Sequence, residues 1–261
     1  MKERLYRSLI ELTNGRMTSM ALGKFARSRL SRPLIKTYAK AYKINQKEML
    51  DDIHHYPNLH AFFIRKLKKD ARPIDLKIDT VTSPVDGILE NWGIINEDCE
   101  MIVKNKSYSI EEMLGGIERS GKYSGGTFMI LYLSPAHYHR IHSPLDGKVI
   151  ESYSLGRKSY PVNRLGLKYG KSTLAKNFRT ITELKHGDTT IAMVKVGAMF
   201  INSVKIINQK SEWKKGEEAA YFSFGSTVVL LFEKGAFQME KSLEVPTEVQ
   251  VGEALGRVIS T

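Results

Sequence analysis

Phe224-Gly225-Ser226-Thr227 leads directly into the apolar run Val228-Val229-Leu230-Leu231-Phe232, which predicts a strand in the middle of the fold. Ser226 follows a glycine, which has no Cβ to resist the twisted backbone needed for attack on the preceding carbonyl. If a base removes the hydroxyl proton, the amide becomes an ester, and elimination leaves a dehydroalanine. Hydrolysis of that group leaves a pyruvoyl group on a new N-terminus. Taken alone, a glycine-serine-threonine sequence that merely opens a strand is the more ordinary interpretation.

The chain has 261 residues, which is enough for one large domain or two small ones. Its hydrophobic content of 42% and charged content of 26% are typical of a globular protein. Cys99 is the single cysteine, so no intrachain disulfide can form. This argues against an oxidising compartment and against a cysteine-based metal site.

The formal net charge of +12 is concentrated near the N-terminus, where residues 1–50 hold twelve basic and three acidic residues. Such a segment favours an anionic surface, either lipid headgroups or nucleic acid. No stretch approaches the roughly twenty apolar residues that a spanning helix needs. Charges also interrupt the apolar residues Leu5, Leu9 and Leu12, so we expect neither a spanning segment nor a recognisable export signal. The chain can still lie on a membrane.

The first part of the chain is predicted to form short helices. Leu5, Leu9 and Leu12 have helical spacing, and Ser31 with Pro33 predicts the start of a later helix. Basic residues next to aliphatic and aromatic ones suit a helix that lies in a membrane interface. A solvated helical surface packed on the rest of the protein is an equal alternative.

From about Lys77 the pattern changes to strands and turns. Thr127–Leu133 and Ile191–Val196 predict buried strands, and helical signal becomes scarce. Ser109 with Glu112 predicts a capping box for a short helix. We therefore predict an α+β fold, with a basic helical region at residues 1–75 and a mostly antiparallel β domain at residues 76–261.

Two segments of the chain are repeated. Ser83-Pro84-Val85-Asp86-Gly87 is echoed by Ser143-Pro144-Leu145-Asp146-Gly147, and residues 213–220 are echoed by residues 249–256. Such turns resemble those of the barrel-sandwich domains that carry biotinyl and lipoyl groups, so we expect an element of this kind. The chain lacks the M-K-M of those domains, which argues against a carrier role. Chance recurrence of so common a dipeptide as Asp-Gly is the alternative.

Three histidines lie between Pro135 and Pro144, directly after a predicted buried strand. A zinc site needs three or four ligands, and the sequence has neither an H-E-x-x-H motif nor a cysteine pair. We therefore predict a site of proton transfer with no metal.

Four ordered motifs resemble those of the bacterial, pyruvoyl-dependent phosphatidylserine decarboxylases. His139-Arg140-Ile141-His142-Ser143-Pro144 resembles their Y-H-R-x-H-x-P segment, and Ser83-Pro84-Val85-Asp86-Gly87 resembles their S-P-x-D-G. Residues 215–227 resemble the K-G-x-E…F-x-F-G-S-T processing segment, and residues 59–73 the F-F-x-R-x-L…R-P stretch. The matches cover roughly residues 55 to 260 and are together far more specific than any one alone.

The resemblance implies that Asp86, His142 and Ser226 form a self-cleaving triad. His142 takes the hydroxyl proton of Ser226, and Asp86 fixes the tautomer of His142 and stabilises its imidazolium. The bond between Gly225 and Ser226 breaks, and Thr227 helps to position it.

Cleavage implies a large chain, 1–225, and a small chain, 226–261, that stay associated through the strand Val228–Phe232. The covalent cofactor is pyruvate, present as a pyruvoyl group made from Ser226. The substrate amine forms a Schiff base with it, carbon dioxide leaves, and the carbanion is reprotonated. His139 either delivers that proton or orients the substrate carboxylate, and the sequence leaves both roles open.

The resemblance also implies a lipid substrate, phosphatidylserine, and phosphatidylethanolamine as the product. The basic N-terminus then docks on an anionic membrane and not on nucleic acid, as a peripheral protein of the cytoplasmic face. A homodimer is one oligomeric state that the resemblance allows. Two other functions stay open: a pyruvoyl-dependent decarboxylase of a soluble amino acid, and a non-enzymatic basic β domain that binds membranes.

Overall fold

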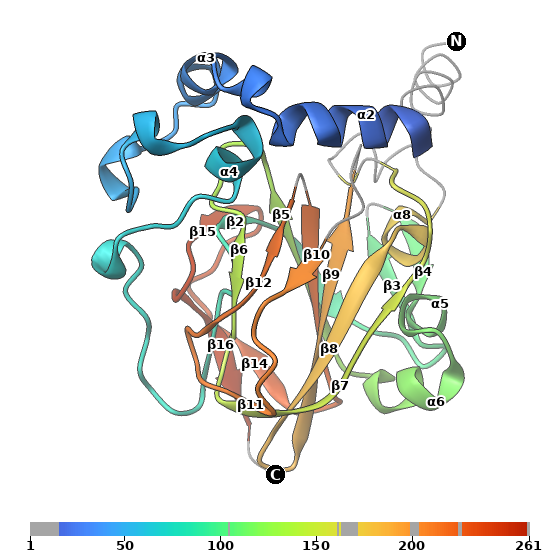
Figure 1. Cartoon of the computed structure of the whole chain (residues 1–261). Helices are drawn as coiled ribbons and strands as arrows, with labels where there is room; N and C mark the ends of the chain where they lie inside the picture. The colour runs from blue at the N-terminus through green and yellow to red at the C-terminus, as the bar shows by residue number, and fades with distance from the viewer. Residues whose placement is uncertain are drawn as a thin grey trace.

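The computed structural model describes residues 16–103, 105–160, 162, 172–198, 204–223 and 226–259. A large antiparallel sheet runs through the middle of the molecule, with one group of helices across one end and another against one side (Figure 1). The fold is therefore α+β, as the sequence predicts. The helix expected around Leu5, Leu9 and Leu12 lies outside the described residues.

The helices are short and form two groups. The N-terminal group consists of α2 (Arg16–Arg27), α3 (Leu34–Ala41) and α4 (Leu59–Phe63), with the 3-10 turns η1 (Arg29–Ser31), η2 (Gln46–Glu48), η3 (Ile53–His55) and η4 (Lys69–Ala71). The second group consists of α5 (Ile110–Leu114), α6 (Ile117–Ser120), η5 (Gly121–Tyr123) and α8 (Thr173–Lys176). The predicted cap of α5 is confirmed, because the Ser109 hydroxyl accepts a hydrogen bond from the Glu112 N–H at 3.0 Å. No helix in the described part of the chain is long and apolar enough to cross a membrane.

Eight strands form the large sheet, and every neighbouring pair is antiparallel. Their order is β11 (Glu212–Trp213), β7 (Gly147–Leu155), β8 (Arg179–His186), β9 (Thr189–Gly197), β13 (Ser226–Phe232), β5 (Thr127–Leu133), β2 (Gly87–Ile94) and β15 (Thr247–Val249). The predicted strands at 127–133 and 191–196 are confirmed.

Three smaller sheets complete the described fold. One contains β1 (Thr80–Thr82), β16 (Ala254–Val258) and β14 (Phe237–Met239), and another contains β10 (Val204–Ile206), β12 (Glu218–Phe222) and β6 (Arg140–His142). The third is the hairpin of β3 (Glu100–Val103) and β4 (Lys106–Ser109). The large sheet ends in β11 on one side and β15 on the other, so the described strands do not close into a barrel. The barrel-sandwich element is not confirmed and stays a prediction.

Strand β13 is buried on both faces, which explains its continuous apolar sequence. Val228, Leu230 and Phe232 belong to a core that also includes residues of the smaller sheets, whereas Val229 and Leu231 belong to a second core with α5 and α8. Successive side chains of a strand point to opposite faces, so covering both faces requires an unbroken apolar run.

The two Ser-Pro-x-Asp-Gly turns bind each other through reciprocal hydrogen bonds. The N–H of Thr82 donates to the Pro144 carbonyl at 2.9 Å, and the N–H of His142 donates to the Pro84 carbonyl at 2.8 Å. The residue before each turn thus contacts the second residue of the other. The recurrence seen in the sequence is therefore a structural repeat and not a coincidence.

The second pair of repeated segments, residues 213–220 and 249–256, also makes equivalent contacts in the structure. The Asp86 carboxylate accepts a hydrogen bond from the Val251 N–H at 3.0 Å, and the Asp146 carboxylate accepts one from the Lys215 N–H at 2.7 Å. The two aspartates therefore hold equivalent loops. They differ in their surroundings, because Asp86 is buried and Asp146 is exposed.

A small separate core holds the N-terminal helices together. It consists of Ile35, Ala39, Ile44, Met49, Tyr56 and Phe62. Hydrogen bonds join this region to the segment after β5, among them those from the Tyr38 hydroxyl to the Pro135 carbonyl and from Arg140 Nε to the Ile64 carbonyl. The domain boundary between residues 75 and 76 stays a prediction.

Lys195 on β9 is fully buried without a carboxylate partner in the described part of the chain. Its Nζ donates to the Thr182 hydroxyl at 2.8 Å and to the Met193 carbonyl at 3.2 Å. Burial lowers the pKa of Lys195 to about 7. The unfolded chain therefore binds one more proton than the folded chain between about pH 7 and the ordinary lysine pKa of 10.5.

Replacing Lys195 by methionine tests this burial in the Ser226→Ala background, in which the self-cleavage expected from the sequence cannot occur. We expect Lys195→Met to be the more stable protein at pH 7. Its advantage should shrink by up to about 1.4 kcal/mol per pH unit towards pH 10, because the native protein gains stability as its unfolded state loses the extra proton. Urea titrations across this range measure the difference. Lys185→Met, at an exposed position on β8, should show no such trend. A pH-independent difference for Lys195→Met would contradict the prediction.

Candidate active site

The residues singled out in the sequence gather at one end of the large sheet. Ser226 is the first residue of β13 and pairs with Leu133, the last residue of β5. Asp86 directly precedes β2, the neighbour of β5 on its other side. His142 lies in β6, and its N–H donates a hydrogen bond to the carbonyl of Pro84. The carbonyl of His139 accepts a hydrogen bond from the N–H of Phe222 at 2.9 Å.

Ser226 is fully buried between β5 and β9. Its Oγ has no hydrogen-bond partner among the described residues, and the same is true of Thr227 Oγ1. Gly225 and Phe224 lie outside the described residues. An unpartnered buried hydroxyl is costly and calls for a functional explanation, so Ser226 and Thr227 stand out from the apolar residues that follow them in the strand.

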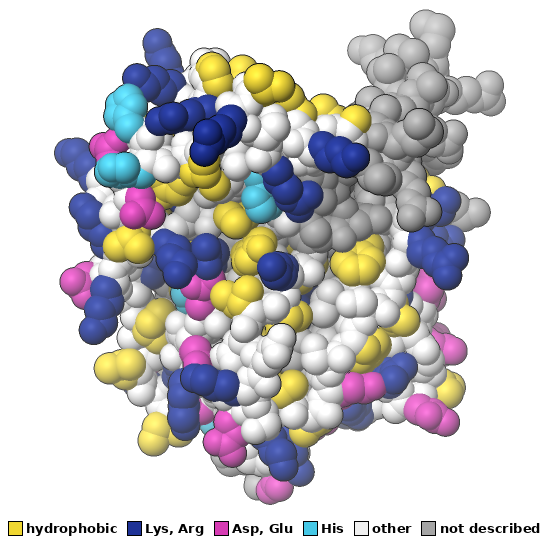
Figure 2. Space-filling model, in the orientation of Figure 1, with side chains coloured by type: hydrophobic (Ala, Val, Ile, Leu, Met, Phe, Trp, Pro, Cys, Tyr) yellow, Lys and Arg dark blue, Asp and Glu magenta, His cyan; other side chains and the backbone are white. Residues whose placement is uncertain are grey.

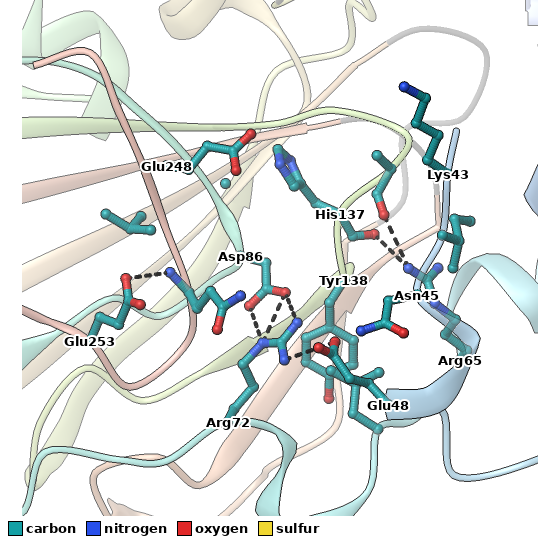
Figure 3. A pocket seen from close by; sticks show the side chains of 16 residues that line it. Lys43, Asn45, Glu48, Arg65, Arg72, Asp86, His137, Tyr138, Glu248 and Glu253 are labelled. Carbon is teal, nitrogen blue, oxygen red and sulfur yellow. Dashed lines mark hydrogen bonds and ion pairs between the residues drawn. The ribbon is translucent and has the colours of Figure 1, made fainter. Parts of the chain in front are cut away.

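Asp86 is bound by Arg72. The Arg72 Nη2 lies 2.6 Å from Asp86 Oδ2, and Nε lies 2.9 Å and 3.0 Å from the two carboxylate oxygens (Figure 3). Arg72 also reaches Glu48 at 3.1 Å. Together with the Val251 N–H, these contacts fix the Asp86 carboxylate on the wall of a cavity.

His142 has a partner on each ring nitrogen, and neither is Asp86. Nδ1 lies 2.8 Å from the Gly216 carbonyl, which can only accept, so Nδ1 carries the proton. Nε2 then accepts from the Tyr138 hydroxyl at 3.2 Å. The expectation that Asp86 fixes the tautomer of His142 is therefore corrected, because the backbone of Gly216 does so.

Burial keeps His142 neutral. Burial lowers its pKa, while the Gly216 carbonyl and the charges of Glu218 and Asp86 act in the opposite direction. The charge of Asp86 therefore favours the imidazolium form of His142 through space and not through a direct hydrogen bond.

His139 is fully buried, and its ring lies against that of Phe63, with the centroids 3.9 Å apart and the planes tilted by 36°. Its Nδ1 donates to the His137 carbonyl at 2.8 Å, and its Nε2 has no hydrogen-bond partner in the described part of the chain. Burial, and then the positive charge of Arg65, lower the pKa of His139 well below its ordinary value. At rest His139 is therefore neutral, with a free acceptor at Nε2.

A cavity of about 490 Å³ adjoins this cluster. Asp86, His137 and Tyr138 line it, together with residues from the turns after α3 and α4 and from the loop after β15 (Figure 3). Its volume is in the range of small-molecule sites.

Sequence reasoning named Arg72, Tyr138 and Gly216 within motifs but gave them no role. Arg72 belongs to the R-P pair, Tyr138 separates two histidines, and Gly216 lies in the processing segment. Glycine is needed at Gly216 because its φ is +76° and a Cβ would lie 2.8 Å from Ile74. The sequence therefore contained these residues, but only the fold reveals their contacts.

Comparison with known proteins indicates one family. The family profile of phosphatidylserine decarboxylases matches residues 59–257. The phosphatidylserine decarboxylase proenzyme of Geobacillus kaustophilus (strain HTA426) is 54% identical over 98% of this chain and 97% of its own. The proenzymes of Anoxybacillus flavithermus (strain DSM 21510 / WK1) and Bacillus thuringiensis (strain Al Hakam) are 55% and 51% identical, over 97% and 98% of this chain and 95% and 97% of theirs. The chain therefore belongs to the phosphatidylserine decarboxylase family.

Proposed function

We propose that the chain is a precursor that cleaves itself between Gly225 and Ser226 and then decarboxylates phosphatidylserine to phosphatidylethanolamine. The observation that carries the proposal is the buried, unpartnered hydroxyl of Ser226 at the end of the sheet where Asp86, His142 and His139 gather. The relatives named phosphatidylserine decarboxylase proenzyme support both the precursor form and the lipid substrate. A soluble amino acid substrate and a non-enzymatic role lack such support.

In the self-cleavage step, His142 acts as the base through Nε2. The Gly216 carbonyl holds the proton on Nδ1 and so leaves Nε2 free to accept one. A rotation of the Tyr138 hydroxyl away from Nε2 gives access to the Ser226 proton, and Oγ then attacks the Gly225 carbonyl. Asp86 stabilises the resulting imidazolium through space. Thr227, with its own unpartnered hydroxyl, helps to hold the scissile bond.

The two products should remain associated. Each of the seven residues of β13 pairs with β5 on one side and β9 on the other. Strand β13 would therefore hold residues 226–261 in the fold after the bond to Gly225 is broken, through its ladder and its buried side chains.

The residues fit a pyruvoyl group at position 226, because a polar atom without a hydrogen-bond partner among the described residues is buried there. Such a group supplies a carbonyl that accepts the electron pair released with carbon dioxide. His139 is unprotonated at Nε2 at rest, so it first accepts a proton from the ammonium group of the substrate and then returns it to the substrate carbon.

The N-terminal helices present a surface suited to an anionic membrane. Apolar side chains are exposed along α2, η1 and α3 beside basic ones, at the upper edge of Figure 2. We call this set the docking face: Leu22, Phe25, Leu30 and Leu34 with Lys24, Arg27, Arg29, Arg32 and Lys36. Apolar insertion and attraction to anionic headgroups add together at such a face, which supports peripheral binding at the cytoplasmic side. The homodimer stays a prediction.

Ser226→Ala tests self-cleavage directly. We expect the wild-type protein to give two bands on a denaturing gel and Ser226→Ala to give one band of 29.6 kDa, because no hydroxyl can attack the backbone. Ser223→Ala, another buried serine three residues earlier, is the matched control and should split normally. Cleavage of Ser226→Ala at the same bond would refute the proposal.

The pH dependence of self-cleavage tests the role of His142. Because burial lowers its pKa below 6.5, the cleavage rate should be constant above about pH 6.5 and fall in more acidic solution as Nε2 is protonated. Asp86→Asn removes a charge that favours the imidazolium, so the acidic decline should move to lower pH. Gel time courses of freshly refolded precursor measure both profiles.

Asp146→Asn is the control for this experiment, since Asp146 makes the equivalent backbone contact in the other turn. Its profile should match that of the wild type. A wild-type decline centred above pH 7, or equal shifts in the two variants, would contradict the assignment.

Membrane docking is tested by the double change Leu22→Ser and Phe25→Ser. Each large apolar side chain contributes about 1.5–3 kcal/mol when it is fully buried, so binding to anionic vesicles should weaken at least about 10-fold. Vesicle flotation measures binding, and a denaturing gel should show normal self-cleavage. Ile94→Ser with Ile102→Ser, at exposed positions on β2 and β3, should leave flotation unchanged. Equal flotation of both double variants would count against the docking face.

A further inference from the structure

Arg65 is a buried cation without an anionic partner. It follows α4, is only 4% exposed, and takes part in no ion pair within the described residues. Its Nη2 donates to the carbonyls of Ala136 and His137 at 3.2 Å and 3.3 Å. Its Nε and Nη1 are buried without any hydrogen-bond partner in the described part of the chain.

Such an arrangement is expensive unless a ligand completes it. A guanidinium stays charged in proteins, and a buried charge needs an opposite charge or several hydrogen bonds. The neighbouring carboxylates are already engaged, because Arg72 binds both Asp86 and Glu48. Two donor nitrogens of Arg65, Nε and Nη1, therefore remain for a group that the described residues do not provide.

The cavity beside Arg65 is polarised. Arg65 lines one side, together with Lys43, Asn45 and Glu48, which is paired with Arg72, and Glu248 and Glu253 lie on the opposite side (Figure 3). Glu253 already accepts the Gln250 N–H at 2.9 Å. An anionic group would therefore be drawn to the side of Arg65 and Lys43.

We propose that Arg65, assisted by Lys43 at the rim of the cavity, binds the phosphodiester of the lipid headgroup. This inference rests on the proposed function, because it assigns a substrate group to the same site. Arg65 is one carbonyl away from His139, since both donate to the oxygen of His137. A phosphodiester held there brings the headgroup beside the histidine that handles the proton.

The phosphodiester fits this site better than the carboxylate of the same headgroup. The carboxylate leaves as neutral carbon dioxide, so an ion pair with it stabilises the ground state more than the transition state. The phosphodiester keeps its charge throughout the reaction, and arginine binds such oxygens through two N–H groups.

Arg65→Gln and Lys43→Gln test the inference, with Arg257→Gln on the exposed side of β16 as the charge-matched control. A denaturing gel first shows whether each variant splits, which tests the proposed function separately. With dioctanoyl phosphatidylserine, we expect kcat/KM to fall about 100-fold for Arg65→Gln and about 10-fold for Lys43→Gln, mainly through KM. Arg257→Gln should match the wild type.

Two competitive inhibitors then identify the group that Arg65 binds. The Ki of glycerophosphoethanolamine should rise about 100-fold in Arg65→Gln, whereas the Ki of O-methylserine, which has no phosphate, should not change. Inorganic phosphate should inhibit the wild type far less than the phosphodiester does. Equal increases for the two organic inhibitors would overturn the inference, as would stronger inhibition by inorganic phosphate. If Arg65→Gln does not split, Lys43→Gln decides, and an unchanged Ki of glycerophosphoethanolamine there refutes it.

Discussion

Strand β13 is the constraint on which the rest of the structure depends. Both of its edges are paired, with β5 and β9, and both of its faces are covered by apolar cores. Its first residue, Ser226, is therefore held at a fixed point of the sheet, opposite Leu133 and Gly197. A reactive hydroxyl needs such a fixed position, because attack on a neighbouring carbonyl is sensitive to small displacements. The same pairing would retain the strand in the fold after the proposed cleavage of the bond that precedes Ser226.

The paired turns explain why Asp86 belongs to the candidate site and Asp146 does not. Asp86 and Asp146 bind equivalent backbone N–H groups in the two repeats. The Asp146 carboxylate accepts a hydrogen bond from the exposed side chain of Lys214, whereas the buried Asp86 is bound by Arg72 and acts on His142 through space. The repeat thus provides two equivalent turns. The helical region contributes Arg72 to the turn of Asp86 and not to that of Asp146.

Burial without a full set of partners is the common property of the site. His139 Nε2, Ser226 Oγ and two nitrogens of Arg65 are all enclosed and unbonded among the described residues. Low local dielectric strengthens each interaction that a substrate can offer to these atoms, and it also makes their unpaired state costly. The lowered pKa values of His139 and His142 follow from the same burial and keep both rings neutral.

The sequence by itself determined the buried strand at Val228–Phe232, the antiparallel β-rich second part and the repeated turns, and it predicted the residues of the candidate site. Apolar runs and Asp-Gly turns are local signals of burial and chain reversal, so they can be read without the fold. Only the tertiary structure decided which atoms meet. Arg72 binds the carboxylate of Asp86, and the carbonyl of Gly216 binds the ring of His142. These contacts form because chain segments that are 14 and 74 residues apart pack together. The unpaired state of Arg65 is likewise invisible in the sequence, because periodicity reports that a side chain is enclosed but not which donors and acceptors surround it.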